Sequence, residues 1–316
     1  MNTDALRSSH TEILIQLVDH ANGILLGKEH ELKLALCCIL ARGHLLIEDQ
    51  PGMGKTTLAK TLAKLLGLKL SRIQFTSDLL PADVLGVSVF DDEKKEFVFH
   101  PGPIFSQFIL GDELNRASPK TQSAFLQAME EAQVTVDTRT YDLPRPFLLM
   151  ATQNPKQSAG TFALPESQLD RFLMKISLGF PSEAAEKELL LSKQHTHHRA
   201  ENIKRLPEVL NPELLMQIQN EVDEVKTREP VVQYILNLVR ESRRAHSGMS
   251  IKGLSPRVGI DLVHAAKAWA YLSGRDFVTP EDVQTIFVPV TQHRFEYEED
   301  HGKSIAQGLV ERVPVL

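Results

Sequence analysis

Cysteine is scarce in this 316-residue chain, which contains only Cys37 and Cys38. Two adjacent cysteines do not make a disulfide scaffold, and they lack the spacing of zinc ligands. We therefore expect two reduced thiols, buried on a helix. Long apolar runs are also missing, since no stretch approaches the roughly 18 apolar residues of a membrane span. The first ten residues lack the apolar segment of a secretion signal. These absences predict a soluble, cytoplasmic protein without membrane contact.

The sequence also has no excess of basic side chains. The sequence has 35 Lys and Arg residues against 41 Asp and Glu residues, which gives a net charge of −6. Sequence-independent nucleic-acid binding needs a positive field, so nucleic acid is not the expected partner, although a local basic groove is compatible with this total. Hydrophobic residues make up 42% and charged residues 24%, the balance of a globular protein with one or two cores.

The first half of the chain alternates short apolar segments with helical patterns. Between the apolar segments, leucines recur at helical spacing, as in the stretch 56–67. This alternation predicts a mostly parallel sheet flanked by helices. The candidate strands are 44–49, 69–75, 106–112, 146–154 and 171–178.

Two segments break this alternation, at 87–99 and 133–143. Each has apolar residues at every second position on either side of a polar turn, which predicts a hairpin that packs on the surface or serves a function. From Pro181 onward only helical patterns remain, and several begin with Asn, Ser or Thr followed by Pro. We predict an α/β domain at residues 1–181, with both hairpins as insertions, and a helical domain at residues 182–316.

The segment IEDQPGMGKTT (47–57) is close to the phosphate-binding pattern G-x-x-x-x-G-K-[ST], with Asp49 in place of the first glycine. In such a loop, backbone N–H groups and a helix N-terminus bind an anion, Lys55 contacts the β- and γ-phosphates, and Thr56 binds Mg²⁺. We expect Asp49 to supply only an unusual backbone angle, which Asp tolerates well. The alternative is a glycine-rich turn that binds nothing. The predicted phosphate-binding residues are Asp49, Gln50, Pro51, Gly52, Met53, Gly54, Lys55, Thr56 and Thr57.

Polar side chains also stand at the ends of two later strands. FILGDELN places Asp112 and Glu113 after an apolar strand, where buried carboxylates are costly unless they meet a cation. Asp112 would bind Mg²⁺, and Glu113 would act as the general base on an attacking water. Asn154 in LLMATQNP would orient that water if its strand lies between the other two. The alternatives are a helix cap for the acids and an ordinary turn for Asn154.

These motifs, taken in order, resemble the MoxR-type AAA+ ATPases. The resemblance covers nearly the whole chain and rests on LLIEDQPGMGKTTLAK, RIQFTSDLLPADVLG, GPIFSQFILGDELNRAS, PFLLMATQNP, LPESQLDRF and SPR. It implies an AAA+ core with a five-stranded parallel sheet of order 5-1-4-3-2, helices on both faces and a helical lid packed over the nucleotide. It also implies ATP or ADP as ligand, with Mg²⁺ held by Thr56 and Asp112. Asp49 at the glycine position is common in this family.

The resemblance also assigns roles to individual residues. Asn154 matches sensor 1, and Arg257 matches sensor 2, an arginine that reaches from the lid to the γ-phosphate. Arg171 matches the arginine finger that serves the neighbouring subunit's ATP, and Arg116 is a rival for that role. Residues 23–29 lie where such proteins pack the adenine, and the two hairpins would face the pore of a ring.

The residues themselves leave alternatives for both arginines. Arg257 follows a Ser-Pro helix start and could be a plain surface residue. Arg171 precedes a strand and could pair with Asp170 or Glu166.

The resemblance implies ATP hydrolysis that drives conformational work in a homo-oligomer, a hexameric ring. The implied task is chaperone-like remodelling or maturation of a protein client, with a separate partner that carries a von Willebrand factor A domain. One alternative is a nucleic-acid-associated AAA+ motor, which the acidic turn DDEKKE (91–96) disfavours. Another is a chelatase-like, nucleotide-dependent interaction switch with little turnover.

Overall fold

The sheet is five-stranded and parallel in the computed structural model, which describes residues 3–137, 139–154, 160–191, 196–244, 253–295 and 301–315. Its strands are β1 (Leu45–Glu48), β2 (Leu70–Gln74), β5 (Phe108–Asp112), β8 (Leu148–Gln153) and β9 (Met174–Ile176). Their spatial order is β2-β5-β8-β1-β9. Counted along the chain, this is the order 5-1-4-3-2, so the five predicted strands and their arrangement are confirmed.

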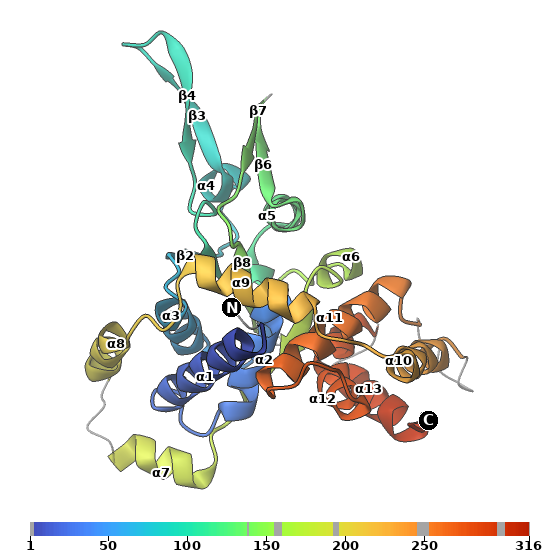
Figure 1. Cartoon of the computed structure of the whole chain (residues 1–316). Coiled ribbons are helices and arrows are strands. Elements are labelled where there is room, and N and C mark those ends of the chain that lie inside the picture. Colours follow the sequence, from blue (N-terminus) through green and yellow to red (C-terminus); the bar gives the residue numbers. More distant parts are fainter. Residues whose placement is uncertain are drawn as a thin grey trace.

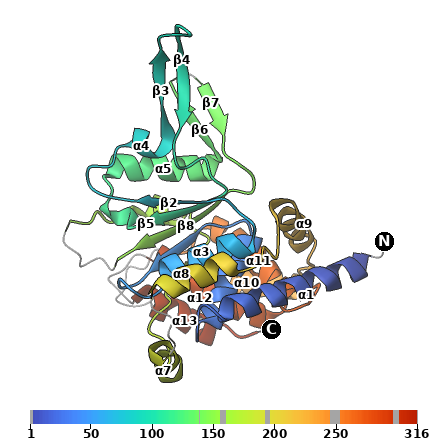
Figure 2. The same ribbon diagram turned by 90° about the vertical axis from the view of Figure 1, so that its left-hand side faces the viewer.

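Helices cover both faces of this sheet, because its strands alternate their apolar side chains between two cores. In β1, Leu45 and Ile47 belong to one hydrophobic cluster, whereas Leu46 belongs to the other. Figure 2 shows α5 (Pro119–Glu131) above the sheet and α3 (Lys55–Leu65) below it. The predicted layers are therefore confirmed.

The chain after residue 181 is helical, as predicted. Apart from a single bridge between Lys226 and Phe277, the described residues of this part form no β-structure. The boundary at 181/182 stays a prediction. The helices are α7 (Glu183–Leu191), α8 (Thr196–Arg205), α9 (Pro212–Asp223), α10 (Glu229–Ser242), α11 (Pro256–Leu272), α12 (Pro280–Thr291), the 3₁₀ turn η2 (Gln292–Arg294) and α13 (His301–Arg312).

The lid helices pack on two N-terminal helices, α1 (Thr3–Asn22) and α2 (Glu29–Leu40). On α2, both cysteines are buried free thiols, as expected, and Cys37 Sγ lies 3.2 Å from the carbonyl oxygen of Ala265 on α11. The sheet, α2 and the lid therefore share one continuous core. Within the described residues, no helix is long and apolar enough to cross a membrane.

Both predicted hairpins are present and project together from the body (Figure 1). β3 (Gly86–Asp91) pairs with β4 (Glu96–Pro101), and β6 (Gln133–Val136) pairs with β7 (Arg139–Asp142). Phe99 of the first hairpin stacks on Tyr141 of the second, with ring centroids 4.1 Å apart. The hairpins therefore support each other above the short helix α4 (Pro81–Leu85) and α5.

Candidate nucleotide-binding site

The predicted phosphate loop joins the carboxyl end of β1 to α3. Gly52 and Gly54 have φ values of 89° and 95°, and a Cβ placed on either would meet nothing within 4 Å. The glycines are therefore required by the backbone conformation, and the space beside them is open. Gly54 is the N-cap residue of α3 and has no side chain to cap it, so the first-turn N–H groups are left for an anion. This geometry fits a phosphate.

Lys55 lies in the field of several acids. Its side chain is buried, and its Nζ donates a hydrogen bond to the carbonyl oxygen of Asp49 at 2.6 Å. Burial lowers the pKa of Lys55, while the charges of Asp49, Asp112 and Glu113 act in the opposite direction. The structure therefore brings the phosphate-loop lysine and the two strand-end acids together, as a site for a phosphate and a metal requires.

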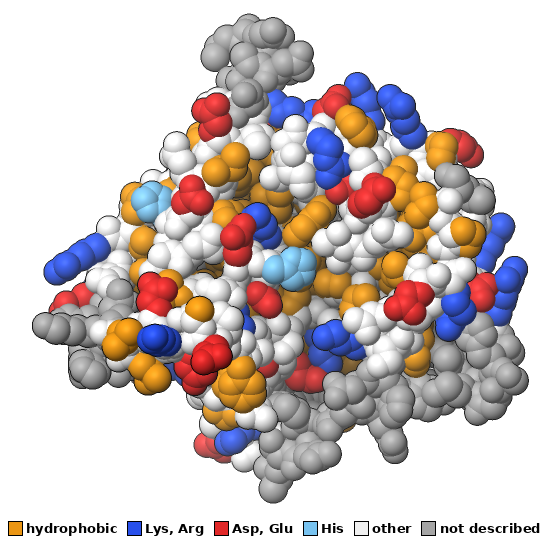
Figure 3. All heavy atoms as spheres, turned by 90° about the horizontal axis from the view of Figure 1, so that it is seen from below, with side chains coloured by type: hydrophobic (Ala, Val, Ile, Leu, Met, Phe, Trp, Pro, Cys, Tyr) orange, Lys and Arg blue, Asp and Glu red, His pale blue; other side chains and the backbone are white. Residues whose placement is uncertain are grey.

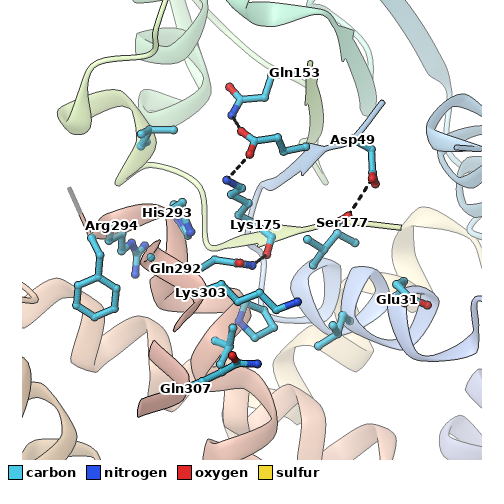
Figure 4. A pocket seen from close by; sticks show the side chains of 18 of the residues that line it. Glu31, Asp49, Gln153, Lys175, Ser177, Gln292, His293, Arg294, Lys303 and Gln307 are labelled. Atoms are coloured by element: carbon cyan, nitrogen blue, oxygen red, sulfur yellow. Dashed lines mark hydrogen bonds and ion pairs between the residues drawn. The ribbon is translucent and has the colours of Figure 1, made fainter. Parts of the chain in front are cut away.

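The expectation that Asp49 supplies only an unusual backbone angle is wrong. Its carboxylate instead accepts hydrogen bonds from the N–H of Leu178 and from Ser177 Oγ, the latter at 2.9 Å, and Figure 4 shows Asp49 facing Ser177. Asp49 thereby links the phosphate loop to the segment that leaves edge strand β9. The described non-glycine residues with positive φ are Arg42, Lys95, Glu113, Ala132 and Asp137.

A second charged side chain holds the same segment. Lys28 Nζ donates to the carbonyl oxygen of Phe180 at 2.7 Å and also to that of Leu178. Segment 177–180 is therefore held through its N–H groups by Asp49 and through its carbonyl groups by Lys28. Lys28 belongs to the stretch 23–29 that was expected near the adenine, and nothing in its local sequence indicates this distant contact.

The two strand-end acids are positioned by residues on neighbouring strands. Thr152 Oγ1, on β8, donates to Asp112 Oδ1 at 2.6 Å and accepts from the backbone N–H of Glu113 at 3.0 Å. Arg72 Nη2, on β2, lies 2.5 Å from Asp112 Oδ2. Neither Thr152 nor Arg72 was a predicted site residue. The acids do not act as a helix cap, because the Glu113 side chain makes no capping bond to the 3₁₀ turn η1 (Leu114–Arg116) that follows.

Asn154 lies beside Glu113, as the strand order predicts. β8 runs between β5 and β1, and Asn154 Nδ2 donates to Glu113 Oε1 at 3.3 Å. On the other side, Arg116 Nε lies 2.9 Å from Glu113 Oε2. Glu113 also has a left-handed backbone, with a φ of 58°, a conformation that costs roughly 1–2 kcal/mol in a non-glycine residue. Such strain is retained where the surrounding structure fixes it, often at functional sites.

Arg171 and Arg257 form a second cluster. Both pair with Glu130 on α5, with Arg171 Nη2 at 3.0 Å from Oε2 and Arg257 Nη1 at 3.2 Å from Oε1. Arg171 also donates to the carbonyl oxygen of Leu126 at 2.7 Å. Asp170, one of the alternative partners of Arg171, pairs instead with an arginine of the lid.

This cluster lies at the opposite edge of the sheet from the phosphate loop. The two arginines line a cavity of about 560 Å³ together with Gly43, His44 and Leu173, which precede β1 and β9. In a parallel sheet, residues before the strands lie at one edge and residues after them at the other. The structure thus groups Lys55, Asp112, Glu113 and Asn154 at the carboxyl edge, and Arg171 with Arg257 at the amino edge.

A larger cavity of about 740 Å³ separates the start of the phosphate loop from the lid (Figure 4). On the core side it is lined by Asp49, Gln50 and Lys175, whose Nζ lies 2.7 Å from Glu48 Oε1. On the other side it is lined by residues of α12, η2 and α13. The lid therefore faces the phosphate loop across an open space.

No cluster of three or more His, Cys, Asp or Glu residues suited to a metal occurs within the described ranges. The predicted metal site relies instead on Thr56 and Asp112, a hydroxyl and a carboxylate. Such oxygen donors fit Mg²⁺, which is commonly bound by one or two carboxylates together with substrate phosphates. The donor chemistry therefore fits a magnesium ion carried by a nucleotide.

Comparison with known proteins agrees with this geometry. A family profile described as "ATPase family associated with various cellular activities (AAA)" matches residues 44–174, and another described as "AAA lid domain" matches residues 243–311. The chain is 42% identical over 309 residues to the protein YeaC of Bacillus subtilis, across 96% of this chain and 95% of YeaC. It is 37% identical over 278 residues to "Chaperone MoxR1" of Mycobacterium tuberculosis, across 86% of this chain and 72% of that protein. A crystal structure of a proposed ATPase from Cytophaga hutchinsonii has a TM-score of 0.85 at 34% identity, with 98% of this chain and 97% of that chain covered.

Asp49→Gly restores the usual first glycine of a phosphate loop but removes the acceptor for Leu178 N–H and the Ser177 hydroxyl. Because a buried donor without a partner costs about 1–3 kcal/mol, we expect the free energy of unfolding to fall by about that amount in urea denaturation. Ser177→Ala removes only the hydroxyl and should cost less. Equal stability of Asp49→Gly and the wild type would show that this link does not hold the segment.

Proposed function

This chain belongs to the MoxR-type family of AAA+ ATPases, and from that membership we propose that it binds ATP with Mg²⁺ and hydrolyses it. We further propose that it works as a homo-hexameric ring in the cytoplasm and remodels or matures client proteins. The observation that carries the catalytic part is the contact of Glu113 with Asn154, beside Asp112 and within the field of Lys55.

Each residue at the carboxyl edge has a defined task in this proposal. Bound ATP and Mg²⁺ supply the phosphoryl group that passes to water and the cation that neutralises its charge. Lys55 and the N–H groups of 52–57 hold the phosphates, and Thr56 and Asp112 hold the metal. Glu113 accepts the proton of the attacking water at its carboxylate, and Asn154 fixes the position of one carboxylate oxygen.

Glu113→Gln keeps the size of the side chain and removes its ability to accept a proton. We expect ATP binding to stay within about twofold, and hydrolysis to fall by roughly 10²–10⁴, the usual contribution of a general base. Binding is measured with a fluorescent ATP analogue and hydrolysis by phosphate release. The matched control is Glu131→Gln, the same change on an exposed acid of α5. An unchanged rate in Glu113→Gln would remove Glu113 from this role.

The position of Arg171 and Arg257 supports a ring. Both arginines lie at the amino edge of the sheet, whereas the phosphate loop of the same chain lies at the carboxyl edge. We propose that they serve the nucleotide of a neighbouring subunit, in a head-to-tail interface that closes by rotation. The contribution of an arginine finger, 10³–10⁵ in rate, would then depend on assembly.

A mixing experiment tests this arrangement. Arg171→Ala and Lys55→Ala should each be inactive alone, because one lacks the finger and the other lacks the phosphate-loop lysine. In equimolar mixed rings, about one interface in four should combine an intact phosphate loop with an intact finger and recover activity. Absence of recovery, with mixed rings verified by sizing, would point to Arg116 or to an arrangement within one chain.

The first hairpin supports contact with a polypeptide client. Phe90 and Phe97 at its end are 46% and 66% exposed and pack edge to face, with centroids 5.3 Å apart. The adjoining turn, 91–96, contains four acids and two lysines, which disfavours nucleic acid. Figure 3 shows the face opposite the hairpins, where the coloured acidic and basic side chains are interspersed without a continuous basic surface. We propose that the hairpin contacts unfolded segments of a client, and that a separate von Willebrand factor A protein assists.

Phe90→Ser combined with Phe97→Ser should weaken binding of fluorescein-labelled casein, an unfolded model client, because both exposed rings are lost. Such surface changes usually alter stability by less than about 0.5 kcal/mol, so thermal unfolding and basal ATP hydrolysis should be unchanged. The matched control replaces Lys94 and Lys95 by Ser in the same turn. Casein binding that survives the double change would exclude these rings as the client contact.

A further inference from the structure

The 3₁₀ turn η2 attaches the lid to edge strand β9 and to the residues just before that strand. Gln292 Nε2 donates to the carbonyl oxygen of Lys175 at 2.6 Å, and His293 Nε2 lies 2.9 Å from that of Phe172. Arg294 Nη2 donates to the same Phe172 carbonyl at 3.1 Å. Three consecutive lid residues therefore contact the backbone in and just before β9, so this part of the lid cannot move without the loop that carries Arg171.

Arg294 is the charged member of this turn, and it is 7% exposed. Its Nε lies 3.1 Å from Asp170 Oδ1, and its Nη2 lies 2.6 Å from Asp261 Oδ2. A buried guanidinium is costly unless carboxylates and hydrogen bonds compensate it, so these contacts fix its position closely. One acid belongs to the core and the other to the lid.

The two acids are attached to the same segments as the two arginines of the amino edge. Asp170 directly precedes Arg171, and Asp261 lies four residues after Arg257 on α11, which places both on one face of that helix. On the opposite side, Glu130 contacts both arginines. The Arg171 loop and the start of α11 are therefore joined twice, through Glu130 and through Arg294.

The cluster as a whole balances its charges. Its three arginines are matched by three acids, Glu130, Asp170 and Asp261. The two residues that link the Arg171 loop to α11, Glu130 and Arg294, differ in exposure. The Glu130 side chain is 39% exposed, whereas that of Arg294 is 4% exposed. Glu130 can therefore release the arginines to a ligand at low cost, while Arg294 keeps their backbone segments in place.

We propose that Arg294 is a positioning residue, which fixes the spacing of Arg171 and Arg257 so that both reach the nucleotide of the neighbouring subunit. This inference rests on the proposed ring ATPase. Arg294 is buried and does not itself contact that nucleotide. It lines the cavity between the core and the lid (Figure 4), and the two acids that it contacts, Asp170 and Asp261, line the cavity of Arg171 and Arg257.

The test uses Arg294→Met, which removes the charge and keeps most of the side-chain volume. We expect binding of a fluorescent ATP analogue to be unchanged and ATP hydrolysis to fall at least tenfold. Mixing with Lys55→Ala should restore activity, because Lys55→Ala subunits supply intact arginines to intact phosphate loops. Mixing with Arg171→Ala should not, because both variants then lack correctly placed arginines. A variant that failed to fold would regain no activity with either partner, because it would also lack an intact phosphate loop.

Two further variants separate positioning from stability. Arg275→Met removes an ion pair to buried Asp282 that lies entirely within the lid, and it should leave ATP hydrolysis intact in the folded protein. Asp261→Asn weakens the Arg294 contact with little change in shape, and it should reproduce the mixing pattern of Arg294→Met with a smaller loss, even where Arg294→Met folds poorly.

The outcomes distinguish this inference from the function on which it rests. If Arg171→Ala and Lys55→Ala fail to complement each other, the neighbouring-subunit arrangement itself is wrong. If they complement while folded Arg294→Met and Asp261→Asn hydrolyse ATP at the wild-type rate, or stay inactive with Lys55→Ala, the positioning role of Arg294 is wrong.

Discussion

The parallel pairing of β8 between β5 and β1 is the constraint on which the candidate site depends. It brings the strand that leads into Asn154 beside the strand that ends in Asp112, with the phosphate loop on the far side. One hydroxyl, Thr152 Oγ1, bonds to Asp112 and to the backbone of Glu113 across that pairing. A register shift of one residue would turn Thr152 to the other face of the sheet and separate these groups.

Buried charge makes the second connection, between core and lid. Apolar packing is non-directional, and a continuous hydrophobic core by itself tolerates small shifts of one part against another. Asp49 and Arg294 add directional contacts at the two edges of the sheet, one to the segment after β9 and one to the segment before it. Because a buried ion without its partner is strongly unfavourable, the Arg294 contacts fix the lid against the core, whereas the Asp49 contact fixes the phosphate loop against the segment after β9 within the core.

The sequence predicted the features that depend on local pattern and on strand order. The five strands and both hairpins follow from periodicity and turn signals, whereas the strand order that places Asn154 beside Glu113 follows from the resemblance to the AAA+ family. The role of Asp49 did not follow, because its acceptors meet donors roughly 130 residues later in the chain. The position of Arg257 in the fold could not be predicted either, because a Ser-Pro start locates a helix but not the sheet edge on which that helix packs. Arg294 carried no motif at all.

The pairing of Arg171 and Arg257 with Glu130 is compatible with a role at a neighbouring nucleotide. The ion pairs with Glu130 are much weaker than the stabilisation that an arginine finger gives to a transition state. A partly exposed ion pair is worth roughly 0–1 kcal/mol, since water and salt screen it. An arginine that contributes 10³–10⁵ in rate stabilises a transition state by about 4–7 kcal/mol. In the proposed ring, the phosphoryl group of an adjacent subunit would therefore outcompete Glu130 for an arginine in the transition state. In that proposal Glu130 would hold the arginines in the isolated chain, and the arginines would respond to assembly.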